Sequence, residues 1–521
     1  MVMNKRVHNI LFHLHTVSSI IISVALFVIF FAGSFSFFRD EIVNWERGHT
    51  VRAEDQFDFS VDSILLALEK DYLLQGRDIE ISKYYKERRV GISLSASKDT
   101  TTATTKSGAF FYMDTKDHTT TSYKESYTLG EFIYRLHFFA QIPYPYGYLL
   151  SGFVAFFFLF VIITGILVHW KKIISNFYVF RPLANMKAVW TDSHTILGLI
   201  GFPFQLVYAV TGAFFMLKSL LLLPFIFTIY EGDRQLLKSD LNDDLKAIDY
   251  SYELLENNPS IDELLSNTSK IWLGFKVNEV KISNNGDKAM RVSISGRMPY
   301  ETKFNGMGKR VYQAMDKKVI YEKNPLQKAS YTDGVKNILY RLHLFDFASL
   351  GVRVISFSLG LISCYVILSG VMIWLVARNK SNTSLKRQRF NKKVVTWYMA
   401  ICLSLYPMMA LEFIIVRIFP SEELNFLYCT FFLGWLLMTL FFVYLKDHSK
   451  ILKVCVLIGG GVGVMIPVIN GIMTGNWLWT SWENQFHQIL FVDLLWLTLG
   501  IVSFFSVIRI KKGKKLFTAL S

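Results

Sequence analysis

The chain has 521 residues, of which 52% are hydrophobic, and its formal net charge is +15. Such a charge could indicate nucleic-acid binding, but the basic residues lie between long apolar runs and form no soluble basic face. We therefore exclude nucleic acid as a partner and expect a lipid bilayer around the protein.

Eight apolar runs are long enough to span a membrane, because about 20 residues at ~1.5 Å each cross a hydrocarbon core of ~30 Å. They lie at about 16–38, 147–169, 195–217, 351–376, 395–418, 424–445, 451–472 and 487–508. The first run is too long for a removed signal peptide and lacks a small-residue cleavage site, so we interpret it as a retained anchor.

Lysines and arginines cluster before the first run and after the second, fourth, sixth and eighth runs. The opposite connections include Trp477, Trp479 and Trp482, which are typical of the outer interface of a membrane. By the positive-inside rule, we expect a multi-pass protein of the bacterial inner membrane with both termini in the cytoplasm.

This topology leaves two long segments outside, and each has the pattern of a small α+β module. In the second segment, a helix capped near Ser260 precedes two alternating strands around Asn-Asn-Gly-Asp, which indicates a β-hairpin. The predicted division is 1–39 (first span), 40–128 (first external module), 129–217 (second and third spans), 218–334 (second external module), 335–378 (fourth span), 379–394 (basic cytoplasmic loop) and 395–521 (C-terminal four-span region).

An internal repeat relates the first four spans. The block Tyr-Arg-Leu-His ends at His137 and again at His343, and each copy precedes a span with Ser/Thr-Gly near its end. His15 and Gly33 are 18 residues apart (33 − 15), as are His194 and Gly212 (212 − 194). We predict a polytopic α-helical protein in which two duplicated hairpins form a four-helix bundle, with the last four spans as an appendix.

Histidines in or beside spanning helices are functional candidates, because polar groups are costly in a bilayer. Those on or next to the repeat are His15, His137, His169, His194 and His343. Three interpretations compete: imidazoles hydrogen-bonded to lipid head groups, a zinc or copper site, and the axial ligation of haem. Zinc or copper would need carboxylates or thiolates nearby, and the sequence supplies none at a suitable spacing.

Haem fits the repeat best, because a six-coordinate b-type haem takes one neutral imidazole from each of two facing helices. The four cysteines lie within spans and form no Cys-x-x-Cys-His motif, which excludes covalent haem and an external disulfide framework. Arg135 and Arg341 precede the outer histidines by two residues and could pair with haem propionates, or else with lipid phosphate. Four glycines could leave room for a macrocycle or allow close helix contact, namely Gly33, Gly165, Gly212 and Gly370.

The "TGAFF" span, the Tyr-Arg-Leu-His block and the "TG…HWKK" ending together resemble the PepSY-associated transmembrane family over about residues 5–378. The resemblance implies PepSY-like external domains and an inner-membrane reductase that carries two haems and releases iron from ferric siderophores. When the axial histidines of the family are carried over to this sequence, they fall on His15, His137, His194 and His343. His169 has no counterpart in the second half, where Trp374 stands, so the inner haem could use any two of His15, His169 and His194.

The sequence shows no nucleotide-binding segment. "IGGGVGV" (458–464) lies inside a spanning run and lacks the Gly-x-Gly-x-x-Gly spacing. Electrons would therefore come from an external donor, either a membrane quinol or a cytoplasmic reductase. The function that we expect is reduction of a ferric siderophore or other Fe(III) chelate in the periplasm. The alternative is a non-redox PepSY regulator or a transporter, for which Glu412 and Asp493 are the few acidic candidates within spans.

Overall fold

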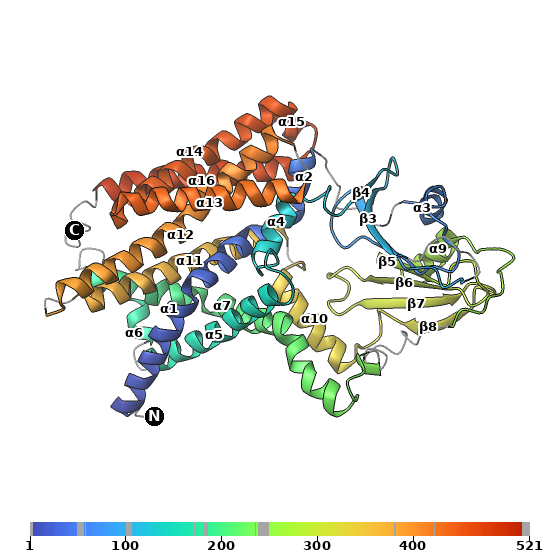
Figure 1. Cartoon of the computed structure of the whole chain (residues 1–521), viewed down its shortest axis with the longest axis horizontal. Helices are drawn as coiled ribbons and strands as arrows, with labels where there is room; N and C mark the ends of the chain where they lie inside the picture. The colour runs from blue at the N-terminus through green and yellow to red at the C-terminus, as the bar shows by residue number, and fades with distance from the viewer. Residues whose placement is uncertain are drawn as a thin grey trace. The chain divides into compact units, whose positions relative to one another are not determined.

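The computed structural model describes residues 4–48, 57, 59–100, 107–170, 173–181, 186–234, 236–237, 249–347, 349–379, 382–420 and 423–512, without the side chains of 176, 186 and 509–512. The chain divides into two compact units. The helical unit comprises 1–50, 128–221 and 342–521, and the sheet unit comprises 51–127 and 222–341. Figure 1 labels the elements of both units.

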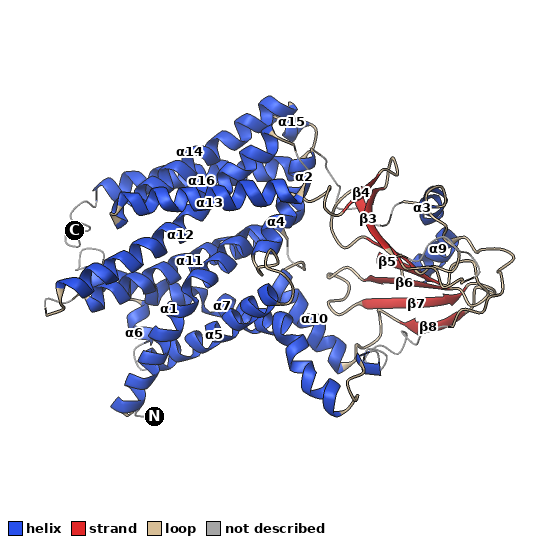
Figure 2. Ribbon diagram, viewed as in Figure 1, coloured by secondary structure: helices blue, strands red, loops and turns tan. Residues whose placement is uncertain are grey.

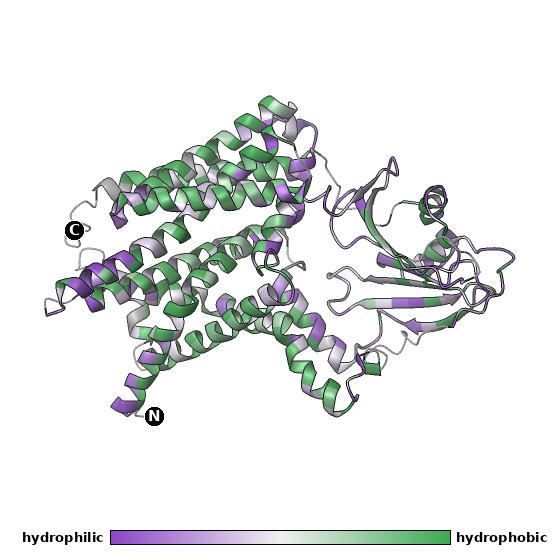
Figure 3. Cartoon of the chain, in the orientation of Figure 1, coloured by the Kyte–Doolittle hydropathy of each residue, from purple (hydrophilic) through white to green (hydrophobic). Residues whose placement is uncertain are grey.

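Within the described residues, eight helices are long and apolar enough to cross a membrane, as the sequence predicts. They are α1 (Lys5–Ser36), α5 (Tyr146–His169), α7 (Met186–Thr228), α11 (Leu350–Arg378), α12 (Leu385–Ile418), α13 (Leu424–Leu445), α14 (His448–Thr474) and α16 (His487–Lys512). Shorter helices are α2 (Arg39–Arg47), α4 (Leu129–Leu136), α6 (Ile173–Phe177), α10 (Tyr331–Leu344) and α15 (Leu478–Glu483). Figure 3 shows that the long helices are mainly hydrophobic.

The four helices of the repeat pack around a shared aromatic interior. On α1, the Phe30 ring lies 5.4 Å from that of Phe158 on α5 and 6.4 Å from that of Phe204 on α7. Helix α11 closes the bundle, because Cys364 contacts the backbone of α1 and Ser363 accepts a hydrogen bond from Gln205 on α7. Helix α7 differs from its prediction, since it continues to Thr228 instead of ending near 217.

The last four spans pack on one another and, through α12, against α1 and α11. Helix α2 also belongs to the helical unit, whereas the sequence division placed its residues in the first external module. One reason is a buried hydrogen bond of 2.8 Å from Trp45 Nε1 on α2 to Asp493 Oδ1 on α16. Asn470 on α14 donates to the other carboxylate oxygen, also at 2.8 Å. A buried tryptophan and a buried carboxylate thus hold α2 on the helical unit.

The two segments that the sequence predicts to be external form one antiparallel sheet instead of two separate modules. Its eight strands are β1 (Ile79–Ser82), β2 (Arg89–Leu94), β3 (Ala109–Asp114), β4 (Thr120–Ser122), β5 (Lys276–Ser283), β6 (Arg291–Arg297), β7 (Met307–Gln313) and β8 (Val319–Lys323). Their order is β4-β3-β2-β1-β5-β6-β7-β8. Figure 2 draws the strands as red arrows. Each segment contributes four consecutive strands, and β1 pairs with β5 in register Ile81↔Val280. This pairing removes two open edges that separate modules would expose.

Helices α3 (Val61–Leu68) and α9 (Ile261–Ile271) cap each other reciprocally. Asp62 accepts hydrogen bonds from Ile261 N at 2.8 Å and from Ser260 Oγ at 2.5 Å. In the mirror arrangement, Asp262 accepts from Val61 N at 2.7 Å and from Ser60 Oγ at 2.5 Å. The matching "SVD" and "SID" sequences therefore join the two halves of the sheet unit through helix N-termini, where carboxylates are stabilising.

We expect Asp62→Ala and Asp262→Ala each to lower the stability of the sheet unit by about 1 kcal/mol, because each removes the acceptor for the other helix's first amide. The effect is measured by thermal unfolding of the purified protein, in which unfolding of the sheet unit is detected as increased protease sensitivity. The matched control is Asp71→Ala, at an exposed position just beyond α3, which should change stability by less than ~0.5 kcal/mol. Equal effects of the three variants would contradict the reciprocal cap.

Candidate functional site

Four of the five candidate histidines form two pairs in the helical unit. The rings of His15 on α1 and His194 on α7 have centroids 6.5 Å apart. The rings of His137, which follows α4, and His343, on α10, have centroids 6.1 Å apart. Within α1, the 18 residues between His15 and Gly33, which is next to His137, correspond to about 27 Å at 1.5 Å per residue. The two pairs therefore lie toward opposite ends of the bundle.

The His15–His194 pair is held by the two spans that follow the Tyr-Arg-Leu-His blocks. His15 Nδ1 lies 2.9 Å from the backbone oxygen of Val161 on α5. His194 Nδ1 lies 3.0 Å from the backbone oxygen of Val366 and 3.0 Å from Ser369 Oγ, both on α11. A carbonyl only accepts, so Nδ1 of each ring carries the proton, which leaves Nε2 as the unprotonated nitrogen of a neutral imidazole.

In the His137–His343 pair, Nδ1 is hydrogen-bonded in both rings as well. His137 Nδ1 lies 2.9 Å from the backbone oxygen of Tyr134, and His343 Nδ1 lies 2.8 Å from Thr211 Oγ1. Thr211 Oγ1 donates its proton to the Val207 oxygen, so His343 Nδ1–H is the donor to Thr211. Burial lowers the pKa of His137, and it lowers the pKa of His343 to about 3. Both imidazoles are therefore neutral near pH 7, as a metal ligand must be.

Three of the four repeat glycines lie against these imidazoles. A Cβ atom at Gly165 would lie 3.1 Å from His15 Cε1, one at Gly370 would lie 3.3 Å from His194 Cε1, and one at Gly33 would lie 3.6 Å from His137 Cδ2. Gly212 instead faces Ala155. Gly33, Gly165 and Gly370 thus make room for the histidine ring itself, a role that the sequence did not predict for them.

The ring-centroid separation of each pair can be compared with that expected for two imidazoles bound to one metal atom. If the two rings face each other in line, two metal–nitrogen bonds of about 2.0–2.1 Å and about 1.1 Å from each ring nitrogen to its ring centre give a centroid separation of ~6.2–6.4 Å. The observed separations of 6.5 and 6.1 Å lie on either side of that range. Among the described residues, no group of three or more His, Cys, Asp or Glu side chains could hold a metal ion. What the described residues offer is therefore two pairs of neighbouring imidazoles.

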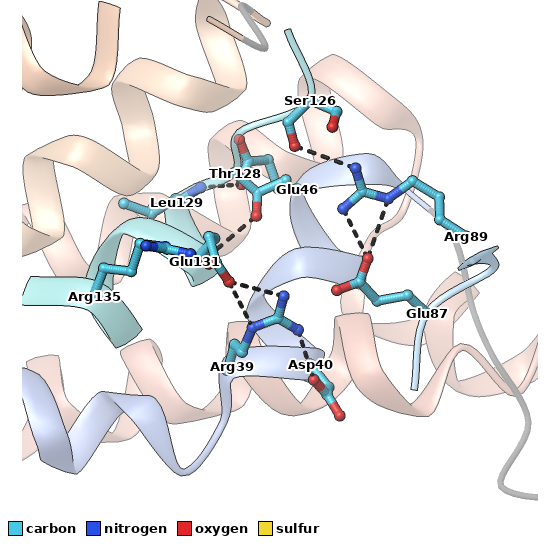
Figure 4. Close-up of polar contacts among 10 residues, drawn as sticks. All are labelled: Arg39, Asp40, Glu46, Glu87, Arg89, Ser126, Thr128, Leu129, Glu131 and Arg135. Atoms are coloured by element: carbon cyan, nitrogen blue, oxygen red, sulfur yellow. Dashed lines mark hydrogen bonds and ion pairs between the residues drawn. The ribbon is translucent and has the colours of Figure 1, made fainter. Parts of the chain in front are cut away.

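The remaining predicted site residues lie outside these pairs. Within the described part of the chain, no ring contact or hydrogen bond joins His169, the last residue of α5, to His15 or His194. Arg135 forms an ion pair of 2.6 Å with Glu131, which also binds Arg39 at 3.0 Å, as Figure 4 shows. Arg341 stacks on the Tyr300 ring at 4.1 Å within the sheet unit. Both arginines thus have protein partners, and their pairing with propionates stays a prediction.

Sequence reasoning missed the groups that orient the histidines. Tyr208 on α7 donates a 2.9 Å hydrogen bond to the backbone oxygen of His343, and the two rings lie 5.1 Å apart. Thr211 could have been found, because it precedes Gly212 as Thr164 precedes Gly165 in the repeat. The backbone acceptors Val161 and Val366 carry no sequence signal, since any residue supplies a carbonyl.

These features define a class: a polytopic membrane protein in which two duplicated helical hairpins hold two half-buried histidine pairs. The family described as PepSY-associated TM region matches residues 12–377. The chain belongs to this family, as its repeated blocks suggest. The matched region begins within α1 and ends within α11, so it includes both pairs and stops before the last four spans. No curated protein matches the chain.

Gly165→Ala and Gly370→Ala should each destabilise the protein by about 1–3 kcal/mol, because the added methyl group overpacks against an imidazole. Gly461→Ala is the matched control, since that helical glycine on α14 has nothing within 4 Å of an added Cβ. Alanine there should be neutral or stabilising by up to ~1 kcal/mol. Thermal melting in one detergent compares the three variants. A gain of stability in Gly165→Ala and Gly370→Ala would show that the rings have space to move.

Proposed function

We propose that this protein is a di-haem electron-transfer protein of the bacterial inner membrane that reduces ferric siderophores or other Fe(III) chelates on the outer side. The observation that carries the proposal is the pair geometry. The ring-centroid separation of each pair is close to that expected for two imidazoles on one metal atom, and each of the four rings already uses Nδ1 in a hydrogen bond. A hydrogen bond at the other ring nitrogen is what fixes the tautomer and orientation of a metal-ligating histidine.

Non-covalent haem b would use His15 and His194 at one site, and His137 and His343 at the other. Haem supplies reversible one-electron chemistry, and the protein sets its position and its environment. The Val161 and Val366 carbonyls orient the first pair, and Thr211 with the Tyr134 carbonyl orients the second. Partial burial favours the neutral form of the rings, which is the form that binds iron.

The outward direction follows from the topology expected from the positive-inside pattern. With both termini in the cytoplasm, the His15–His194 pair is on the inner side and the His137–His343 pair is on the outer side. A siderophore holds Fe(III) through hard oxygen donors, so a gain of one electron gives Fe(II), which the same ligands hold far less tightly. The family resemblance supports such an acceptor. The donor would be external, a quinol or a cytoplasmic reductase.

The purified protein from haem-replete cells should show the visible spectrum of low-spin b-type haem, at two haems per chain. Acidified organic solvent should extract all of it, because no Cys-x-x-Cys-His motif is present. The rival functions, a non-redox PepSY regulator or a transporter, predict a colourless protein. A colourless preparation would overturn the proposal.

His343→Ala and His194→Ala should each remove or convert one low-spin haem signal and leave the other intact, since each variant leaves one pair with a single imidazole. His169→Ala is the matched control, as an additional histidine in the same unit. Electron paramagnetic resonance separates the two sites, because the pairs differ in interplanar angle, 84° against 37°. Loss of a haem signal in His169→Ala alone would refute the assignment of His15 with His194.

Fe(III) reduction can be tested without knowing the donor. The protein is reduced chemically, freed of excess reductant, and mixed with a ferric siderophore and an Fe(II)-specific chelator. We expect haem reoxidation with matching capture of Fe(II), and no reaction with NADH alone. If the haems stay reduced with every ferric chelate but reoxidise with another acceptor, the substrate is wrong while electron transfer stands.

A further inference from the structure

One face of the sheet unit is covered by helices, and the other carries polar side chains. Successive side chains of a strand point to opposite faces of a sheet. On the covered face, Val280 and Ile282 of β5 and Val292 and Ile294 of β6 share a hydrophobic core with residues of α3 and α9. The residues between them therefore belong to the opposite face, where they are partly exposed. We call the opposite face of β5, β6 and β7 the basic face.

Positive charge is concentrated on the basic face. Strand alternation and register place six charged residues there, namely Lys276, Glu279, Lys281, Arg291, Arg297 and Lys309. Their net formal charge is +4 (5 − 1), and the one carboxylate, Glu279, already accepts a hydrogen bond from the Tyr84 hydroxyl. The corresponding face of β1, β2 and β3 carries Glu80, Arg89 and Asp114, with a net charge of −1 (1 − 2). The two halves of the sheet therefore differ in charge.

Two cross-strand pairs on this side of the sheet bring like charges directly opposite each other. Lys276 on β5 is opposite Arg297 on β6, and Lys309 on β7 is opposite Lys323 on β8. Like charges in directly opposite positions destabilise a sheet. Asp333 forms an ion pair of 2.7 Å with Lys323, whereas no carboxylate of the described residues forms an ion pair with Lys276. A negatively charged ligand on the basic face would relieve this repulsion.

Two hydrogen-bond donors of β6 lack partners on the same face. Arg291 Nε and Ser293 Oγ are shielded from water and have no hydrogen-bond partner among the described residues. Ser293 is directly opposite Lys281 on β5, and Arg291 is two residues away along β6, so the three side chains belong to one face. A shielded polar group without a partner is costly, and each of these two atoms could donate to an oxygen of an anion. The donors and the positive charge thus favour the same class of ligand.

We propose that the basic face binds an anionic Fe(III) chelate, in which catecholate or carboxylate oxygens surround the metal. The inference rests on the proposed function, since that function is what makes an Fe(III) chelate the expected ligand. Fe(III) is held by hard, deprotonated oxygen donors. A tris-catecholate keeps a net negative charge when it binds Fe(III), whereas a tris-hydroxamate becomes neutral. The charge of the basic face therefore selects the first class of chelate over the second.

The extent of the basic face also favours a chelate over a single phosphate group. Lys276 and Lys281 are five residues apart (281 − 276) on β5, which corresponds to ~16 Å at ~3.3 Å per residue, and β7 is two strands away at ~4.8 Å per strand. A phosphate ion or a lipid head group would contact only part of this area. A polypeptide would instead pair with an open sheet edge through its backbone and would need no charged face.

Binding can be measured without electron transfer when Ga(III), which has the same charge as Fe(III) and is not reduced, replaces the iron. The Ga(III) complexes of a tris-catecholate and of a tris-hydroxamate are titrated calorimetrically into the full-length protein in a neutral detergent. We expect saturable binding of the tris-catecholate that weakens as salt is added, because salt screens exposed charges. The tris-hydroxamate should bind at least tenfold more weakly. Equal affinities for the two complexes, or no binding of the first, would overturn the proposal.

Two double variants locate the binding site. Lys281→Gln with Arg291→Gln should weaken binding of the Ga(III) tris-catecholate about tenfold, because two charged contacts are lost. Lys288→Gln with Lys317→Gln is the matched control, since it removes the same charge at exposed positions outside the basic face, and it should bind like wild type. Equal weakening in both would show that net charge alone attracts the chelate, and the proposal would be wrong. Should the first double variant fail to fold, Lys276→Gln with Lys281→Gln replaces it.

The outcomes separate this inference from the proposed function. A colourless protein that binds the Ga(III) tris-catecholate through the basic face overturns the haem function, while the binding site stands. A haem protein that reduces both classes of Fe(III) chelate equally, and does so unchanged in Lys281→Gln with Arg291→Gln, overturns the binding site and keeps the reductase. If inorganic phosphate at constant ionic strength, or nanodiscs of anionic lipid, abolish chelate binding, the basic face binds phosphate groups instead and the proposal is wrong.

Discussion

An imidazole that is shielded from water needs a hydrogen bond to at least one ring nitrogen, and the paired histidines, which are half-buried, meet this need through contacts between helices of the bundle. In all four paired histidines the bonded nitrogen is Nδ1. For His15 and His194 the acceptor is a carbonyl on the opposite span of the same half, so each bond holds two helices together as well as one ring. The glycines next to these rings then become necessary, because a side chain at Gly165 or Gly370 would occupy the space of the imidazole. The same combination of histidine, backbone carbonyl and glycine therefore occurs in both halves, as His15, Val161 and Gly165 in the first and His194, Val366 and Gly370 in the second.

The duplication also explains the sheet unit. Each of the two segments of the sheet unit alone has a helix and four strands, with two open sheet edges and a small core. Pairing of β1 with β5 joins the edges, and the helices exchange caps through Asp62 and Asp262. Residues of both halves then share one hydrophobic core, including Ile81, Ile92, Val280 and Ile294. A single sheet buries more apolar surface per residue than two separate modules can.

The features predictable from sequence are those with a strong local or periodic signal. The eight spans follow from hydropathy, because a bilayer imposes a minimum length of apolar helix. The histidine pairings follow from the repeat, because equivalent positions in two halves meet across a symmetric bundle. The pairing of β1 with β5 could not be predicted, since it joins strands some 200 residues apart and depends only on matching edges. Nor could the Arg135–Glu131–Arg39 network, because Arg39 and Glu131 are distant in sequence and approach only when α2 packs beside α4.

The acidic residues of the last four spans bear on the transporter alternative. Asp493 is completely buried, and both carboxylate oxygens accept hydrogen bonds, from Trp45 and Asn470. These partners lie on α2 and α14, so Asp493 connects its own helix, α16, to two others. Such a contact stabilises the packing of the three helices, which is a structural role. Glu412 is also completely buried, and Thr430 donates to it at 2.6 Å. Its other oxygen has no hydrogen-bond partner among the described residues.

A carboxylate in that setting would be an uncompensated charge, whereas a neutral carboxylic acid costs far less to bury. Neither acid belongs to the repeat, and the two are on different helices with different partners. A transport site would instead gather ionisable groups around broken helices near the centre of the membrane. In the family-matched region, by contrast, Tyr208, Thr211 and Ser369 hydrogen-bond to the paired histidines or their backbone, an arrangement that orients imidazoles.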